Sequence, residues 1–148
     1  MGVKLKVSGR ISKPVHEVFE AVADPGKLSG YFTTGGAKGR LETGATVTWD
    51  FADFPGAFPV KVVEVIQDSR IVLNWGTTER GNDETTVIMT FEGLDDGRTL
   101  VTITEEGWGE GERGIKKAIG NTEGWTGMLC ALKVYLEYGI NLREGFYK

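Results

Sequence analysis

The sequence predicts an α+β protein in which a curved antiparallel sheet of six to seven strands packs against one long C-terminal helix. Several short segments before residue 107 alternate apolar and polar residues, which is typical of strands with one buried face. After residue 112, apolar residues recur three and four positions apart, along one side of an α-helix. This apolar stripe needs a surface to pack on, and the strands provide it. The stripe consists of Ile115, Ala118, Ile119, Thr122, Trp125, Met128, Leu129, Leu132, Tyr135, Leu136 and Ile140.

The first elements follow from short local patterns. Apolar residues alternate with polar ones over residues 3–8, which predicts the first strand. Ser12 is expected to cap a short helix that has Pro14 in its first turn, where the missing N–H costs nothing. This helix is expected to end at Asp24-Pro25-Gly26. A second short helix is predicted over residues 27–32, before two consecutive glycines.

The remaining strands differ in how clearly their alternation can be read. Residues 60–66 contain apolar positions whose parity changes midway, which predicts a bulge or a bend. Asp95-Asp96-Gly97 predicts a hairpin turn between the last two strands. The segment 51–59 contains Phe and Pro residues in a pattern too broken for a strand, so we expect a loop that forms a lid or rim, or that folds over the core. Regular strands are predicted at 46–51, 71–75, 85–91 and 99–105, with a weaker one at 38–41.

Composition and charge narrow the classes of function. With 148 residues, the chain is expected to form one domain, 1–148, that buries about 68 to 70% of its unfolded surface. The net charge of -4 argues against binding to the phosphates of nucleic acids. The N-terminal residues lack the apolar block of a signal peptide, and no window approaches the roughly 20 apolar residues of a membrane span. We therefore expect a cytoplasmic protein with no membrane insertion and no nucleic-acid partner.

One histidine and one cysteine leave little room for metal or nucleophilic chemistry. A single cysteine excludes an internal disulfide, and zinc sites need several Cys or His ligands. His16 falls between the apolar positions of the first helix, so it is expected on the solvent side. Cys130 flanks the apolar stripe and is expected to be a small buried hydrophobe. We predict no metal and no cofactor.

A glycine-rich segment precedes the final helix. Gly109 to Gly114 formally matches the dinucleotide-binding pattern G-x-G-x-x-G. Glu110 and Glu112 would repel a phosphate there, and no later strand completes a β-α-β unit. We interpret the segment as an acidic entry loop whose carboxylates favour the positive end of the helix.

The four tryptophans and several neighbouring apolar residues are candidates for a ligand site. Trp49 and Trp75 fall on the inward side of their strands, Trp108 follows the last strand, and Trp125 lies on the apolar stripe. Together with nearby Phe and Met residues they can line a pocket, or they can simply pack the core. The candidate ligand-contacting residues are Trp49, Phe51, Phe58, Trp75, Met89, Glu105, Trp108, Trp125, Met128, Leu129 and Leu132.

Glu105 is the one acidic residue whose strand alternation places it on the inner face, in line with Val101 and Ile103. A buried carboxyl group can act as a general acid or as a hydrogen-bonding group for a ligand. The alternative is a carboxylate at the end of a strand that reaches water or pairs with a base. We expect the alternative, because Glu105 is close to the sheet edge where the chain exits.

Five stretches, in order over nearly the whole chain, carry a resemblance to a known family. They are Ser12-Lys13-Pro14 followed by Val15, Val18 and Phe19; Tyr31-Phe32-Thr33; Arg70-Ile71-Val72-Leu73-Asn74-Trp75; residues 99–108, which end in Glu105-Glu106-Gly107-Trp108; and Gly124-Trp125-Thr126 with Leu129, Leu132 and Leu136. Together they resemble the homologues of the activator of the heat-shock-protein-90 ATPase, a branch of the START-like (SRPBCC, helix-grip) superfamily.

The resemblance implies a helix-grip fold with a cavity between the sheet and the C-terminal helix. In that superfamily the cavity commonly holds lipids, sterols, polyketides or other apolar molecules. Our leading hypothesis is therefore the binding of a small hydrophobic or aromatic ligand, by a binding protein rather than an enzyme.

Two other functions follow from the same resemblance. One is a co-chaperone-like interaction module, as in a stress response, whose partner is a chaperone or another protein and whose docking patch includes Phe54 and Phe58. The other is a cyclase or hydratase that uses Glu105, assisted by Tyr31 or Tyr135.

Overall fold

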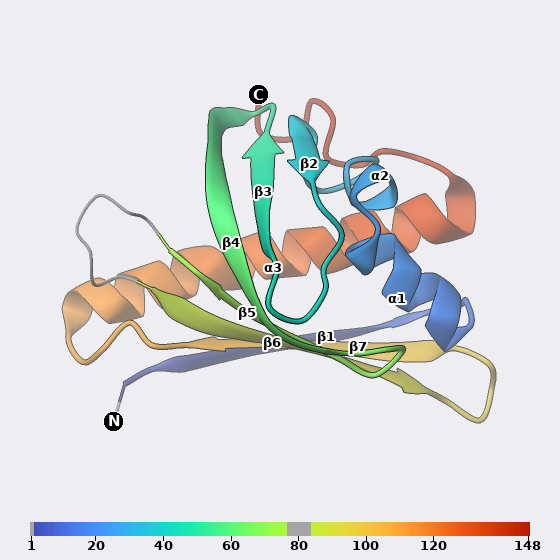
Figure 1. The fold of residues 1–148 in the computed structure, drawn as a ribbon, viewed down its shortest axis with the longest axis horizontal. Helices are drawn as coiled ribbons and strands as arrows, with labels where there is room; N and C mark the ends of the chain where they lie inside the picture. Colours follow the sequence, from blue (N-terminus) through green and yellow to red (C-terminus); the bar gives the residue numbers. More distant parts are fainter. Residues whose placement is uncertain (1, 77–83) are drawn as a thin grey trace.

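An antiparallel sheet and the long helix α3 form the two main layers of the computed structural model, which describes residues 2–76 and 84–148 (Figure 1). Within these residues the sheet has seven strands in the order β1-β7-β6-β5-β4-β3-β2. The START-like helix-grip fold and the two short helices after the first strand are confirmed. The elements are β1 (Lys4–Ile11), α1 (Val15–Ala23), α2 (Pro25–Leu28), β2 (Gly36–Lys38), β3 (Thr46–Phe51), β4 (Phe54–Ile66), β5 (Arg70–Trp75), β6 (Thr85–Gly93), β7 (Thr99–Glu106) and α3 (Glu112–Tyr138).

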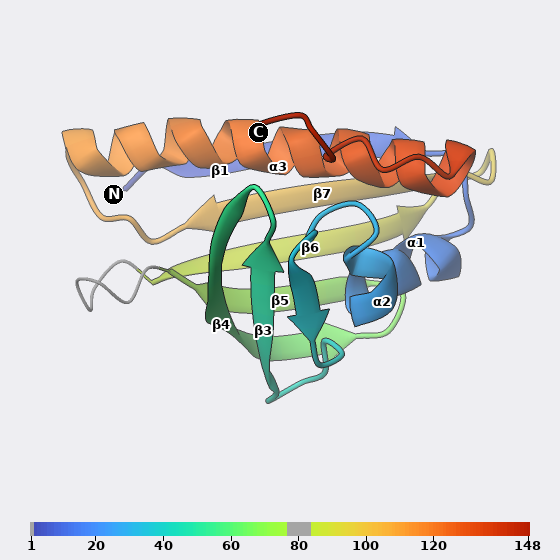
Figure 2. The ribbon, with the colours of Figure 1, turned by 90° about the horizontal axis from the view of Figure 1, so that it is seen from above.

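The sheet changes direction along β4. Figure 2 shows β1, β7, β6 and β5 running along α3, whereas β3 and β2 run across it. The first part of β4 pairs with β3, and its second part pairs with β5 from Lys61 onward. The register shifts between Val62 and Glu64, which confirms the predicted bulge. A bulge bends a strand, and here it lets one strand join the two halves of a curved sheet.

The segment before this bulge corrects one prediction. Residues 54–59 belong to β4 and not to a loop, and Phe51 pairs with Phe54 across a two-residue turn. Pro55 and Pro59 are tolerated because this part of β4 is paired with β3, while its pairing with β5 begins only at Lys61. Proline has no backbone N–H to donate, and toward β5 this part of the strand needs none.

The short helices also differ from their predicted bounds. Pro14 occupies the N-cap position of α1 and no side chain caps it, so Ser12 does not have the capping role that we expected. Helix α2 begins at Pro25, because Asp24 caps it by accepting a hydrogen bond from the Lys27 N–H at 3.0 Å. It ends at Leu28, before the end of the predicted 27–32 range. The weak strand expected at 38–41 is found slightly earlier, as β2.

Helix α3 faces the sheet with only part of the apolar stripe. The first part of the stripe is turned outward, because Ile115 and Ile119 are 50% and 68% exposed. The residues that α3 buries in this part are small, and a Cβ on Gly114 would lie 3.0 Å from the carbonyl oxygen of Gly109 in the loop before the helix. Gly114 and Ala118 are thus turned inward and the two isoleucines outward. The buried residues of α3 are Gly114, Ala118, Trp125, Met128, Leu129, Ala131 and Leu132.

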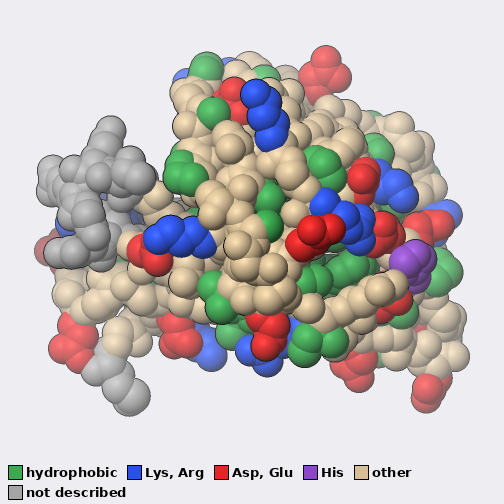
Figure 3. Space-filling view, in the orientation of Figure 1, with side chains coloured by type: hydrophobic (Ala, Val, Ile, Leu, Met, Phe, Trp, Pro, Cys, Tyr) green, Lys and Arg blue, Asp and Glu red, His purple; other side chains and the backbone are tan. Residues whose placement is uncertain are grey.

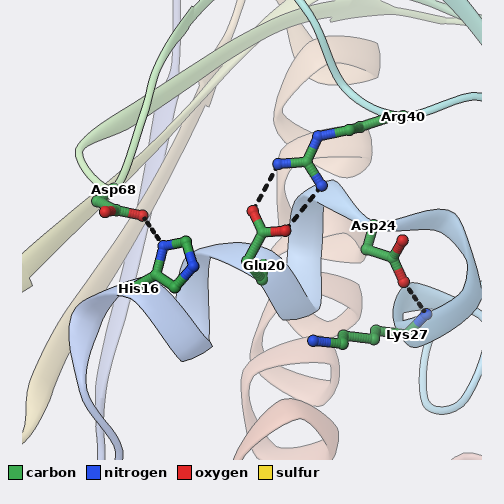
Figure 4. Close-up of polar contacts among 6 residues, drawn as sticks. All are labelled: His16, Glu20, Asp24, Lys27, Arg40 and Asp68. Carbon is green, nitrogen blue, oxygen red and sulfur yellow. Dashed lines mark hydrogen bonds and ion pairs between the residues drawn. The ribbon is translucent and has the colours of Figure 1, made fainter.

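An ion pair attaches α1 to the segment before β3 (Figure 4). Glu20 accepts two hydrogen bonds from Arg40, with Nη1–Oε1 at 2.8 Å and Nη2–Oε2 at 2.5 Å. The hydrogen bonds from Arg40 lower the pKa of Glu20 below its ordinary value, and the opposing effect of burial is smaller. His16, on the same helix, is exposed as predicted, and its Nδ1 lies 2.8 Å from Oδ1 of Asp68.

Glu20→Gln is expected to lower the free energy of unfolding by about 0.5–1 kcal/mol at pH 7. A carboxyl group with a lowered folded-state pKa stabilises the protein above its unfolded pKa, near 4.3, and this contribution disappears as the pH falls through the folded pKa. Urea unfolding at pH 7 and at pH 3 should therefore show the difference from the wild type shrinking at the lower pH. Glu17→Gln, on the exposed side of the same helix, is the matched control. A deficit that stays constant with pH would contradict this account.

Candidate functional site

Glu105 lies between the sheet and α3 and contacts both. Glu105 is only 1% exposed, although it lies near the end of β7. Oε2 accepts hydrogen bonds from Thr85 Oγ1 at 2.5 Å and from Trp75 Nε1 at 2.9 Å. Oε1 accepts from Asn121 Nδ2 at 3.0 Å and from Trp125 Nε1 at 2.7 Å. Within the part of the chain that the structure describes, Glu105 is bound by neutral donors from three other elements and not by water or a base, which contradicts our expectation.

This arrangement joins the sheet to the helix. A carboxylate only accepts hydrogen bonds, and here each oxygen accepts from two donors among the described residues. Sequence reasoning missed Asn121 as a partner. The available sign was its spacing, since Asn121 precedes Trp125 by four positions and therefore lies on the same side of the helix.

Six aromatic rings form a continuous set beside Glu105. Neighbouring ring centroids are 5.0 to 5.9 Å apart, in edge-to-face, tilted and stacked arrangements. Such distances are those of favourable aromatic pairs. Five of the rings were candidates from the sequence, and Phe32 was not, although it lies in the predicted second helix and in the stretch Tyr31-Phe32-Thr33. We call this set the aromatic cluster: Phe32, Trp49, Phe51, Phe58, Trp75 and Trp125.

Two features of the aromatic cluster resemble a ligand site more than a closed core. Phe51, Phe58 and Trp75 are only half-buried. Trp49 is 1% exposed, and its indole N–H has no acceptor in the part of the chain that the structure describes. A buried donor without an acceptor is costly and rare, so this N–H has a hydrogen bond left to make.

The other predicted candidates belong to the surrounding core. Met89, Met128, Leu129 and Leu132 are buried in the same apolar cluster as Trp49 and Trp125. Trp108 is half-buried and packs against this core, close to Gly114 of α3. The structure thus brings the apolar candidates into one region, in which the aromatic cluster has the most accessible members.

Tyr31 and Tyr135, the proposed helpers of an enzyme, have structural roles. The Tyr31 hydroxyl donates a hydrogen bond to the carbonyl oxygen of Ala21 at 2.9 Å. Burial, with a smaller contribution from Tyr135, raises the pKa of Tyr31 well above its usual value. The two rings lie 5.2 Å apart, so Tyr31 is a fixed, neutral part of the core.

A groove lies on the flank of α3 that does not face the sheet. It has a volume of about 640 Å³ and runs between α3 and residues 139–148, which we call the C-terminal segment. Cys130 lies in its wall and is exposed, which corrects the expected burial, because α3 turns this side away from the sheet. Further wall residues are Ile119, Thr122, Glu123, Thr126, Gly127, Ala131, Leu142, Arg143, Phe146 and Tyr147.

Arg143 connects this groove with the aromatic cluster. Its Nε and Nη2 lie 3.0 and 3.1 Å from the two carboxylate oxygens of Asp53, in the turn between β3 and β4. Its guanidinium carbon lies 4.6 Å from the ring centre of Phe51 and 5.5 Å from that of Phe32. Sequence analysis could not find this pair, since its members are 90 positions apart and belong to no motif.

Surface charge, metal ligands and helix length in the described residues bear on nucleic-acid, metal and membrane binding. On the face shown in Figure 3, acidic and basic side chains are interspersed and do not form one basic patch. Across residues 2–76 and 84–148, no group of three or more His, Cys, Asp or Glu side chains is placed to hold a metal ion. Among the helices of these residues, none has the length and apolar character needed to cross a membrane.

Solved structures share this architecture. SSP2350 from Staphylococcus saprophyticus is similar with a TM-score of 0.81 and 29% identity, covering 95% of this chain and 96% of that one. DynU16, from the dynemicin biosynthetic locus, has a TM-score of 0.79 and 28% identity over 92% of this chain, but only 48% of its own. PFC0360w, an HSP90 activator from Plasmodium falciparum, has a TM-score of 0.73 and 21% identity, covering 91% and 96% of the two chains. The search of curated proteins found no match.

The sequence itself identifies the family. Residues 12–137 match the family described as "Activator of Hsp90 ATPase homolog 1-like protein". The matched range contains Glu105, its four donors and the whole aromatic cluster. Because the match covers most of the chain, the protein belongs to the family of activator of Hsp90 ATPase homolog 1-like proteins, with their START-like fold.

Proposed function

We propose that the protein binds a small hydrophobic, aromatic molecule against the aromatic cluster. The observation that carries the proposal is the buried indole N–H of Trp49, which has no acceptor among the described residues and lies between aromatic rings. Small-molecule sites are mostly apolar and contain a few polar groups that fix the ligand's orientation. The cluster offers this combination, with ring faces for stacking and one unused donor.

The same observations indicate the chemistry of the ligand. The half-buried rings of Phe51, Phe58 and Trp75 favour a flat aromatic molecule that stacks on them. Trp49 favours a carbonyl or other oxygen acceptor on that molecule. Phe51 and Phe58 lie 5.9 Å apart and are stacked, so a ligand that inserts between them must separate the two rings.

A second candidate function is docking on a chaperone or another protein. Family membership supports it, and so do large apolar side chains that remain exposed. Phe54 is 51% exposed, as the predicted docking patch requires, whereas Phe58 is half-buried in the aromatic cluster. Catalysis by Glu105 receives less support, because the described donors already occupy both of its carboxylate oxygens.

Ligand binding can be tested by tryptophan fluorescence. We expect the signal to change on titration with naringenin and emodin, which carry carbonyl groups, and with N-phenyl-1-naphthylamine, which has no oxygen. Trp49→Phe keeps an aromatic ring but removes the N–H. It should weaken the binding of the first two compounds by about 2-fold to 13-fold, which corresponds to the loss of one hydrogen bond. The affinity for N-phenyl-1-naphthylamine should stay within twofold, because this compound has no oxygen that could accept the lost hydrogen bond.

The choice of variant matters for this test. Trp125→Ala would also weaken binding, but it removes a hydrogen-bond donor from Glu105 and thereby perturbs the fold. If all three compounds leave the fluorescence unchanged, the ligand-binding proposal fails and docking becomes the better candidate. Equal losses for all three compounds in Trp49→Phe would refute the assigned role of the N–H.

A further inference from the structure

The C-terminal segment turns back over the molecule after α3. Gly139 ends the helix in a left-handed conformation, with φ at 70°, and its N–H donates to the carbonyl oxygen of Tyr135 at 2.9 Å. Figures 1 and 2 show the segment returning along α3 and ending near the turn between β3 and β4. At this end, the rings of Tyr147 and Phe54 lie 5.8 Å apart. The segment therefore spans the distance between the helix and the β3–β4 hairpin.

Arg143 and Asp53 are the anchor of this segment. Their side chains are only 13% and 7% exposed, and the guanidinium binds the carboxylate through two nitrogens. By contrast, Ile140 and Leu142 are 55% and 39% exposed, so burial of apolar side chains holds this part of the segment weakly. A largely buried, two-point ion pair is strongly weakened when one partner loses its charge.

The same guanidinium separates two regions. On one side it belongs to the wall of the groove between α3 and the C-terminal segment. On the other side it covers the rings of Phe51 and Phe32. The Phe32 ring in turn contacts Trp49 and Trp125, and the Phe51 ring contacts Phe32 and Phe58. Groove, guanidinium and aromatic cluster thus follow one another in space, and moving the guanidinium would expose the rings to the groove.

We propose that the Arg143–Asp53 pair is a gate, and that a ligand reaches the aromatic cluster from the groove when this pair opens. The inference rests on the proposed function, because it concerns access to the same cluster. It adds an entry route and a conformational step that limits how fast the ligand binds. The groove, of about 640 Å³, receives the apolar molecule before the gate opens.

The gate is tested with Asp53→Asn, which removes one charge at nearly constant shape, and with Arg143→Lys as a milder variant. Stopped-flow mixing with N-phenyl-1-naphthylamine measures the association rate, and acrylamide quenching of tryptophan fluorescence measures access without any ligand. We expect Asp53→Asn to raise the association rate about fivefold, since the rate follows the fraction of open molecules. Acrylamide quenching should increase in the same variant, and Arg143→Lys should give a smaller change of both quantities.

Glu20→Gln is the matched control, because it breaks a two-point Arg–carboxylate pair between α1 and the segment before β3, neither of which contributes a ring to the aromatic cluster. It should change neither the rate nor the quenching. Hydrogen exchange measured by mass spectrometry shows whether each variant is folded, and in Asp53→Asn residues 139–148 should exchange faster while the sheet stays protected.

The two proposals fail in different ways. If the probe binds to the wild type and to Asp53→Asn at the same rate, with equal quenching, the gate is wrong and ligand binding stands. If quenching and exchange increase in Asp53→Asn but no compound binds to any variant, the gate stands and the proposed ligand function is wrong. An equal increase in Glu20→Gln would also overturn the gate.

Discussion

Glu105→Gln is expected to lower the free energy of unfolding by about 3 kcal/mol, because it places an amide NH₂ among hydrogen-bond donors. In the wild type, one carboxylate oxygen accepts from Trp75 and Thr85, and the other accepts from Asn121 and Trp125. The amide does least harm when its nitrogen faces Thr85, whose hydroxyl can turn and accept. In that orientation the indole N–H of Trp75, which donates to the same oxygen as Thr85 in the wild type, loses its acceptor.

Urea unfolding followed by tryptophan fluorescence at pH 7 measures this loss. Glu106→Gln is the control, because Glu106 is the next residue on β7 but is exposed. It should change the stability by less than about 0.5 kcal/mol. A Glu105→Gln protein as stable as the wild type would show that the four donors do not depend on the carboxylate.

Leu132→Ala is expected to lower the free energy of unfolding by about 3 kcal/mol, through lost burial and the cavity that remains. Leu132 is 0% exposed on the sheet-facing side of α3. Ile119→Ala removes a side chain of similar size from the same helix, but Ile119 is 68% exposed, so its loss should be below about 1 kcal/mol. Denaturant unfolding of both variants compares the two positions directly, and similar losses would contradict the observed rotation of α3.

The order of the elements could be predicted because each one has a local cause. Alternation in β6 and β7 fixes which side chains face the core, and it correctly placed Glu105 inside. The parity change between Val60 and Ile66 correctly predicted the bulge of β4. By contrast, residues 54–59 contain two prolines, and their strand conformation depends on pairing with β3 alone, which no local pattern reveals.

The partners in the site were harder to predict, because they depend on how separate elements are rotated and placed. The apolar stripe assigned Ile115 and Ile119 to the sheet, but the rotation of α3 leaves both of them exposed. The same rotation brings Asn121 to Glu105. Arg143 and Asp53 meet only because the C-terminal segment turns back after α3, so the tertiary structure alone creates this pair.

The strand order has a consequence for the behaviour of the chain in a crowded solution. The two outermost strands of a sheet have unpaired backbone groups, which can serve as templates for pairing with another chain. On one border this protein has β2, which is only three residues long. On the other border, β1 carries the exposed charges of Lys4, Lys6 and Arg10. The short length of β2 and the positive charges of β1 thus protect the molecule against aggregation through its two outermost strands.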